Sequence, residues 1–296
     1  AATSLAGSIV SLTAAMDGRA SLAFSNGIGG IAAQTAFLAL ADLLHRRVNL
    51  EHAAAELANV FQGMLLILLL SLPLLAWSLP EVAVLSVHPL SVVLVGVYIL
   101  GVRAVHRVRE APMWHPVRPA DTRPDAPDEP QSRDRSTLML AGQFALLMLV
   151  MGAAGFVIAK SAGQMVDRLG LSASVVGALL TAVVTSLPEL VTTLAAVRRG
   201  ALQLAVGGII GGNTFDTLFL TISDVGYREG SLYHAVGQAD FFWLVVGVVM
   251  TTILTLGQLY RQRRGPGGIG MESLMLLCVY GAAVAVQALL PAVGSM

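Results

Sequence analysis

Three residues of this chain place oxygen-bearing side chains inside apolar segments. Glu189 lies in the stretch TSLPELVTT, and Asn213 and Asp216 lie one apolar segment later, in GGIIGGNTFD. If these segments span a membrane, their ionisable residues are candidate functional residues by default, because charge is costly there. Carboxylate and amide oxygens are the ligands that hard cations prefer. The residues therefore predict a cation site at bilayer depth.

A proline next to the first carboxylate predicts a local break in its helix. Pro188 lacks a backbone donor and displaces the carbonyl of the preceding turn. Carbonyls freed at membrane depth are tolerated where protein, water or an ion satisfies them. Thr185 and Ser186 add hydroxyl oxygens beside the break. A plain structural kink is the alternative interpretation of the proline alone.

The composition indicates a membrane protein. Apolar residues make up 55% of the chain and charged residues only 12%, against about 25% charged in a typical soluble domain. The mean hydropathy is +0.75. The 18 basic residues balance the 18 acidic ones, which argues against nucleic acid as a partner. Since the sequence has no nucleophile elbow, phosphate loop or zinc-binding spacing, we do not expect an enzyme.

Hydropathy predicts eight spanning helices in two halves. A spanning helix needs about 20 apolar residues, and a shorter apolar piece covers 1–16. Residues 107–136 contain six prolines and charges of both signs, which is typical of a flexible linker. We predict a first membrane repeat at 1–106 and a second at 137–296. The expected helices cover 20–44, 54–79, 88–106, 137–160, 171–198, 202–224, 236–260 and 271–293.

The distribution of arginine predicts the orientation. Loops on one side of the expected helices carry 14 of the 18 basic residues, and these loops lie near 46–47, 103–135, 198–199 and 261–264. The positive-inside rule makes that side cytoplasmic. On the opposite side, Gln238 and Asp240 begin a helix and are expected at the membrane interface; the alternative is that they line an ion entry.

The chain contains an internal repeat. Shifted by 182 residues, residues 3–38 match residues 185–220 at 14 of 36 positions, and later helices follow the same offset. The second half has five helices, whereas the first shows three and a short piece. By symmetry we expect about 45 residues to precede Ala1. Units with an odd number of crossings insert in opposite orientations, as in secondary transporters that bind substrate near the midplane.

The segments TSLPEL and GGNTFDTLF together resemble the α-repeat signature of the sodium/calcium exchangers, in the cation/calcium antiporter superfamily. The stretch from Val157 to Leu190 is also similar to the sixth and seventh helices of that family. The resemblance implies ten helices in two inverted repeats, with the second, third, seventh and eighth helices surrounding the ions. By position, the ligands that it implies are Thr185, Ser186, Glu189, Asn213 and Asp216.

The first repeat departs from the family pattern. Ala6 and Gly7 stand where the family has Pro-Glu, and Ile31 and Gln34 stand where it has later asparagines. Two carboxylates, both from the second repeat, can neutralise one divalent ion but leave few anionic positions for additional sodium ions. The polar candidates that remain in the first repeat are Thr3, Ser4, Asn26 and Gln34.

Together these observations predict an all-α polytopic membrane protein of inverted five-helix repeats, the first of them N-terminally incomplete in this chain. We expect a secondary-active cation antiporter, calcium against sodium, in a bacterial inner membrane. Its partners would be the lipid bilayer and small inorganic cations, with no cofactor besides the transported ions. The alternatives are an exchanger for another cation or for protons, or a degenerate homologue that serves as a scaffold or sensor. The sequence leaves the oligomeric state open.

Overall fold

The computed structural model describes residues 2–45, 49–117, 125, 136–265 and 268–293. Within these ranges the chain is helical apart from turns, connectors and one isolated bridge between Val84 and Val87. Seven helices are long and apolar enough to cross a membrane, and a pair bent by 42° makes an eighth span. The prediction of an all-α polytopic membrane protein is confirmed.

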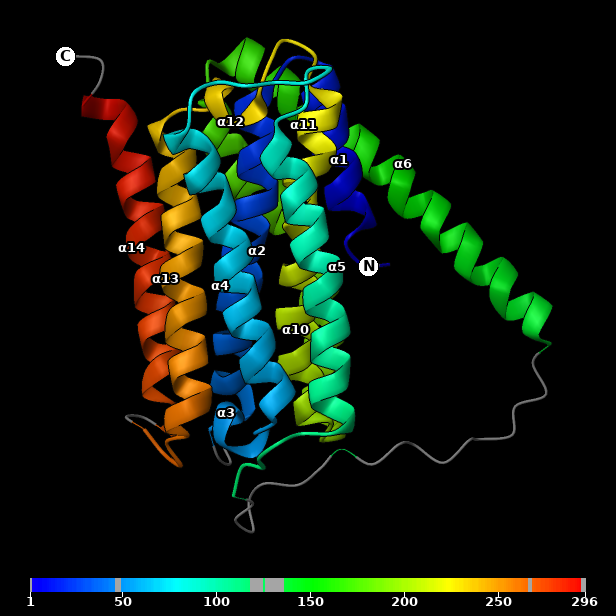
Figure 1. Ribbon diagram of the computed structural model, residues 1–296, viewed down its shortest axis with the longest axis vertical. Helices are drawn as coiled ribbons and strands as arrows, with labels where there is room; N and C mark the ends of the chain where they lie inside the picture. The colour runs from blue at the N-terminus through cyan, green and yellow to red at the C-terminus, as the bar shows by residue number, and fades with distance from the viewer. Residues whose placement is uncertain (1, 46–48, 118–124, 126–135, 266–267, 294–296) are drawn as a thin grey trace.

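The first half consists of five helices, and most of them stand in one bundle (Figure 1). They are α1 (Leu5–Met16), α2 (Ala20–His45), α3 (Leu50–Ala53), α4 (Leu57–Ser78) and α5 (Pro89–Glu110). The last helix extends four residues beyond the predicted end at 106. Of the linker predicted at 107–136, residues 118–124 and 126–135 lie outside the described residues.

The second half begins with the long helix α6 (Thr137–Leu169), whose first part leaves the bundle (Figure 1). The bent span follows as α7 (Ala173–Val175), the π-helix η1 (Val176–Thr181), α8 (Ala182–Thr185) and α9 (Leu187–Arg199). The remaining elements are α10 (Leu202–Asp216), α11 (Leu218–Gly226), α12 (Leu232–Ala235), α13 (Gln238–Tyr260) and α14 (Met271–Val293).

Element boundaries repeat at the offset found in the sequence. The short helices α3 and α12 begin at Leu50 and Leu232, and α5 and α14 begin at Pro89 and Met271. Packing repeats too, because α4 lies against α5 as α13 lies against α14. Figure 1 shows α3 and α12 at opposite ends of the bundle. The two halves therefore run in opposite directions, as the odd number of crossings predicts.

A buried aspartate closes the bundle at each end. Asp42 accepts the backbone N–H groups of Leu50, at 2.8 Å, and of Gly270, at 3.0 Å. Its counterpart Asp224 accepts the two corresponding backbone N–H groups, at the start of α12 and just before α5, at 2.9 and 2.8 Å. The same capping contacts thus join the start of a short helix to the start of a spanning helix in both repeats.

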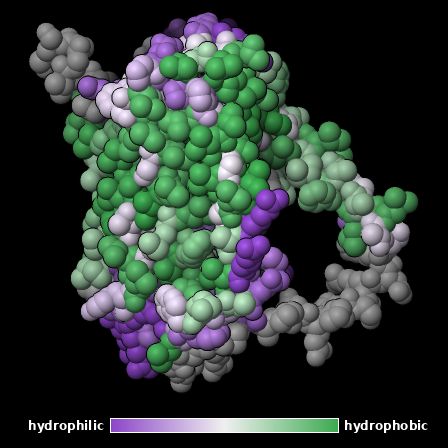
Figure 2. Space-filling view, in the orientation of Figure 1, coloured by the Kyte–Doolittle hydropathy of each residue, from purple (hydrophilic) through white to green (hydrophobic). Residues whose placement is uncertain are grey.

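Helix α2 forms the centre of the bundle. Twenty of its 26 residues are buried, and it packs against η1, α13, α14 and α10. Gly29 allows the closest of these approaches, because a Cβ atom there would overlap the Ala178 backbone of η1. The exterior carries a broad apolar band between more polar ends (Figure 2), as expected for a protein surrounded by lipid.

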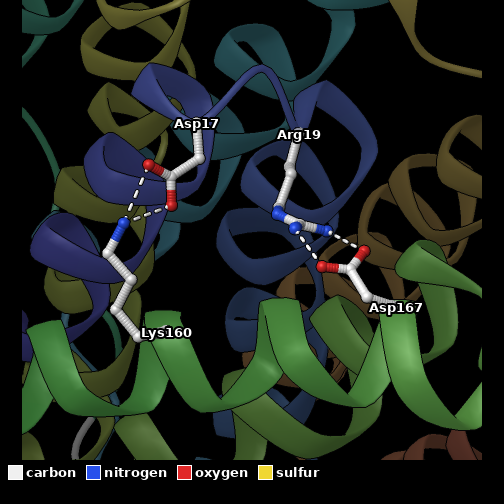
Figure 3. A network of polar contacts seen from close by, with 4 residues as sticks. All are labelled: Asp17, Arg19, Lys160 and Asp167. Carbon is white, nitrogen blue, oxygen red and sulfur yellow. Dashed lines mark hydrogen bonds and ion pairs between the residues drawn. The ribbon is translucent and has the colours of Figure 1, made fainter.

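Two ion pairs hold α6 to the turn between α1 and α2 (Figure 3). The Lys160 ammonium lies 2.6 Å from the Asp17 carboxylate, and the Arg19 guanidinium lies 2.6 Å from Asp167. Both bonds come from the second half of α6. They fix that half of the helix beside the first repeat.

Asp240, which is expected at the membrane interface, lies in the first turn of α13 and packs against α2. Its side chain is buried and accepts hydrogen bonds from Ser25, at 2.5 Å, and from Ser21, at 2.7 Å. Asp240 also accepts the backbone N–H of Gly237, at 2.9 Å, and so caps α13. Polar partners on α2, which hydropathy alone does not reveal, allow this carboxylate to be buried.

Candidate functional site

Both intramembrane carboxylates lie beside breaks in their helices. Ser186 separates α8 from α9, and Pro188 is the second residue of α9, so the predicted break is confirmed. A second break, at Thr217, follows Asp216 at the end of α10. Glu189 stands in the first turn of α9. Breaks expose backbone groups, and polar side chains or ions satisfy them.

The Glu189 carboxylate faces the first repeat. Its Oε1 atom accepts a hydrogen bond from the Ser4 hydroxyl, at 3.3 Å, and Thr3 also interacts with it. The Oε2 atom is buried and has no hydrogen-bond partner among the described residues. Ser4 interacts with the Asp216 carboxylate as well. The start of α1 therefore lies between the two acidic residues.

Asp216 is bonded to its own repeat counterpart. The Gln34 amide donates to Asp216 Oδ2 at 2.7 Å and to the Ser186 hydroxyl at 3.3 Å. Gln34 and Asp216 are related by the 182-residue offset. Two counterparts that touch each other must lie near the axis that relates the repeats. This contact therefore marks the interface where a transporter of inverted repeats binds its substrate.

Two asparagines direct their amide nitrogens into the protein. Asn213 donates to the Thr35 hydroxyl at 3.0 Å. Asn26 donates to the Gly7 carbonyl at 3.0 Å and to the Ser11 hydroxyl at 2.9 Å. With the nitrogens bonded in this way, each amide oxygen is left as an acceptor.

Five buried acceptor oxygens carried by these residues have no hydrogen-bond partner in the part of the chain that the structure describes. A cation can satisfy oxygens of this kind, since hard cations bind carboxylate and amide oxygens. The described residues contain no group of three or more His, Cys, Asp or Glu side chains that could hold a metal; the site has two carboxylates. The five oxygens are Glu189 Oε2, Asp216 Oδ1, Asn213 Oδ1, Gln34 Oε1 and Asn26 Oδ1.

The predicted hydroxyl residues take different places. Ser4 and Ser186 make the contacts described above, and Thr3 is half-buried at the start of α1. The Thr185 hydroxyl donates to the Thr181 carbonyl of its own helix at 2.8 Å, so only its lone pairs remain for a ligand. Hydrogen bonds thus join Ser4 to Glu189, and Gln34 to both Asp216 and Ser186. Asn26 is bonded instead to the backbone of Gly7.

Sequence reasoning missed Phe219, which lies against Gly7, the repeat counterpart of Glu189. A Cβ atom on Gly7 would lie 2.8 Å from Phe219 Cε2 and 3.6 Å from the Thr185 hydroxyl. Phe219 is buried and packs edge-on against Phe215. The aromatic ring therefore occupies the place where a first-repeat side chain would begin. Sequence reasoning also missed Thr35, whose hydroxyl accepts the Asn213 amide. In the sequence, Thr35 is marked by its identity with Thr217 at the 182-residue offset.

A family model described as sodium/calcium exchanger protein matches residues 139–289, a little more than half of the chain. The matched stretch includes Glu189, Asn213 and Asp216.

Two curated proteins show similarity over a shorter stretch. The sodium/calcium exchanger MaX1 of Methanosarcina acetivorans is 33% identical over 128 residues, which cover 42% of this chain and 33% of that protein. The inner membrane protein YrbG of Escherichia coli is 33% identical over 127 residues, covering 43% of this chain and 38% of that protein. The similarity thus spans between about a third and two fifths of each relative's length.

Solved structures are similar over nearly the whole chain. The sodium-calcium exchanger NCX_Mj superposes with a TM-score of 0.60 at 19% identity, covering 96% of this chain and 83% of that one. The H+/Ca2+ exchanger CAX superposes with a TM-score of 0.61 at 13% identity, covering 97% and 76%. At these identities the superpositions establish the fold.

Proposed function

Since the chain belongs to the sodium/calcium exchanger protein family, we propose that it is a secondary-active antiporter that exchanges calcium against sodium. The proposal rests on one observation above all. Five buried oxygens, two from carboxylates and three from amides, lack hydrogen-bond partners among the described residues. Oxygens buried at this depth without hydrogen-bond donors are costly unless a cation binds them.

The charge of the site supports a divalent substrate. Glu189 and Asp216 supply two negative charges, and the Asp216 carboxylate feels the charge of Glu189. One calcium ion neutralises both. Sodium ions entering the same oxygens would weaken calcium binding by competition, which is the requirement for exchange.

The Gln34–Asp216 hydrogen bond supports alternating access at this place. It joins α2 of the first repeat to α10 of the second, at 2.7 Å. The Gln34 nitrogen holds one Asp216 oxygen, while Gln34 Oε1 and Asp216 Oδ1 are left for the ion. Movement of one repeat against the other would strain this bond, and a bound cation would compensate by bridging the same residues.

A second candidate is exchange of a cation against protons. The observation that favours it is the absence of a carboxylate at Gly7 and Gln34, which leaves few anionic positions for several sodium ions. Two carboxylates can instead release one calcium ion by each taking up a proton. In this version the same site works with a different coupling ion.

Calcium uptake into proteoliposomes tests the proposal. We expect uptake to require an opposing sodium gradient and to be lost in Glu189→Gln. The control is Glu56→Gln, which removes a carboxylate paired with Arg109, away from the site. Uptake driven by a proton gradient, and not by sodium, would favour the second candidate. Intact cation flux in Glu189→Gln would refute both candidates at this site, whereas no cation flux in wild type would favour a scaffold or sensor.

A further inference from the structure

Three carboxylates are buried together at the arginine-rich end of the bundle, outside the proposed ion site. They belong to Asp42 of α2, Glu51 of α3 and Glu272 of α14, with exposed fractions of 1%, 0% and 5%. None of the ion pairs between described residues involves any of them. Burying an ionised carboxylate without a partner is expensive, so this group needs a compensating ligand.

The three carboxylates differ in how they are satisfied. Asp42 accepts two backbone N–H groups, as described above. Glu272 accepts a hydrogen bond from the Asn49 amide. Both carboxylate oxygens of Glu51 are buried and lack a partner among the described residues, although Glu272 lies within hydrogen-bonding reach. Glu51 is therefore the unsatisfied member of the group.

At the opposite end of the molecule, the position that corresponds to Glu51 holds a neutral hydrogen-bond donor. The counterpart of Glu51 is Tyr233, whose hydroxyl lies 2.9 Å from the Ser91 hydroxyl, and Ser91 donates to Asp224 at 2.6 Å. A neutral group with an O–H donor completes that network. At the α3 end, Ser273 is the counterpart of Ser91, and its hydroxyl is also without a partner within the described ranges. A glutamate can supply an O–H donor only when it is protonated.

Two of the basic side chains near α3 contact backbone carbonyls. Arg261 donates to the carbonyls of Val117 and His52, and the His52 ring contacts the Arg261 carbonyl. Helices α10 and α13, which pack against α3, carry charged residues only at their far ends. The other titratable groups at this end, within the described residues, are His45, at the end of α2, and Arg263 and Arg264, in the connector before α14.

We propose that the buried Glu51 carboxyl group binds a proton, forming a proton site separate from the midplane ion site. The proton comes from solvent and forms an O–H bond on Glu51, which then donates to Glu272. Burial, together with the Asp42 and Glu272 carboxylates, raises the pKa of Glu51 well above its ordinary value. Loss of the proton sets two buried charges against each other at the joint of α2, α3 and α14.

The sign of the pH effect follows from the raised pKa. The stabilisation that the bound proton gives to the folded protein is fully present below the ordinary glutamate pKa of about 4.3. The folded protein holds the proton over a range in which the unfolded chain has lost it, so stability falls as pH rises through the folded pKa. The joint between α3 and α14 is then tight in acid and loosened in alkali.

The test uses the purified full chain in detergent, with thermal unfolding followed between about pH 5 and pH 9. We expect the wild-type midpoint to fall as pH rises. The Glu51→Gln variant, neutral at every pH, should lose this fall and unfold at a higher temperature than wild type at the alkaline end. Glu56→Gln, which removes a nearby carboxylate outside the group, should retain the wild-type slope.

Infrared spectroscopy provides a second measurement that does not depend on stability. One component of the buried protonated carboxyl absorption of wild type should be missing from Glu51→Gln at the same pH. An unchanged spectrum, or equal pH slopes in wild type and Glu51→Gln, would overturn the proposal. So would calcium restoring the alkaline midpoint of wild type but not of Glu51→Gln, because the ligand would then be a metal cation. The inference does not rest on the proposed antiport.

Discussion

The two repeats share one backbone plan but divide the work of the ion site unequally. Helix α2 of the first repeat is continuous from Ala20 to His45, whereas its counterpart is broken into α10 and α11 at Thr217. The second repeat supplies Glu189 and Asp216; the corresponding residues of the first are Gly7 and Gln34. Duplication therefore preserved the fold while charge and helix breaks were concentrated in one copy.

This difference assigns roles to the repeats. In the proposed site, the second repeat carries the charge that would attract a cation. The first supplies the donors Ser4 and Gln34, which orient the carboxylates, and an uninterrupted helix around which the bundle packs. Substitutions that move charge between the repeats should therefore test the assignment directly.

The largest effect is expected when charge is removed from the second repeat. Asp216→Asn leaves a single carboxylate for a divalent ion. Truncating one partner of a buried charge pair costs about 2–5 kcal/mol, so calcium affinity, measured by calorimetry, should fall by roughly 30-fold or more. Asp17→Asn, at the α1–α2 turn, is the control and should bind calcium normally. Wild-type affinity in Asp216→Asn would remove this residue from the site.

A smaller effect of opposite sign is expected when charge is added to the first repeat. Gln34→Glu places a third carboxylate against Asp216 and removes the donor that Asp216 now uses, at 2.7 Å. Without calcium the variant should unfold at a lower temperature than wild type, because two buried like charges face each other. With calcium its midpoint should rise more than that of wild type, since tighter binding to the folded state stabilises it further.

The Gln34→Asn variant controls for the change in shape, because it keeps the amide on a shorter side chain. It should show neither the deeper loss without calcium nor the larger gain with it. If Gln34→Glu and Gln34→Asn respond alike to calcium, the first repeat does not contribute charge-sensitive positions to the site.

Restoring the second missing carboxylate requires room. In Gly7→Glu the new side chain would begin 2.8 Å from Phe219 Cε2, and overpacking a core costs about 1–3 kcal/mol. We expect Gly7→Glu alone to be less stable without binding calcium more tightly. Combined with Phe219→Leu, which shortens the obstructing side chain, it should regain stability and gain affinity. Equal penalties for Gly7→Glu in both backgrounds would show that the ring is not the obstacle.

The spacing of apolar segments and the internal repeat predict much of this architecture. Eight apolar segments predict the eight spans, and the 182-residue offset predicts which elements correspond. Pro188 predicts the break at Ser186, and the break at Thr217 has no such signal because no proline accompanies it. Carboxylates inside apolar segments indicated Glu189 and Asp216, and the resemblance to a family added to that evidence; two helices that the sequence already delimits set their positions.

Contacts between distant segments could not be predicted in the same way. Whether a polar atom is satisfied depends on side chains from other helices, as the burial of Asp240 against α2 shows. Phe219 reads as an ordinary core residue until Gly7 is placed beside it. The burial of Glu51 beside Glu272 joins residues 221 positions apart in the numbering, and hydropathy treats each as a polar helix end.

The smallest effect concerns the turns that end α1 and α9. Two ion pairs hold the α1–α2 turn to α6. The corresponding turn at Gly200 follows Arg198 and Arg199, the last two residues of α9. Lys160 and Asp17 are 45% and 35% exposed, and pairs this exposed contribute about 0.2–1 kcal/mol. A double-mutant cycle of Lys160→Gln and Asp17→Asn in thermal unfolding should give a coupling within that range, weakened by salt, with cation flux unchanged. If either substitution lowers the cation flux and leaves the stability unchanged, the ion pair between α6 and the α1–α2 turn takes part in transport.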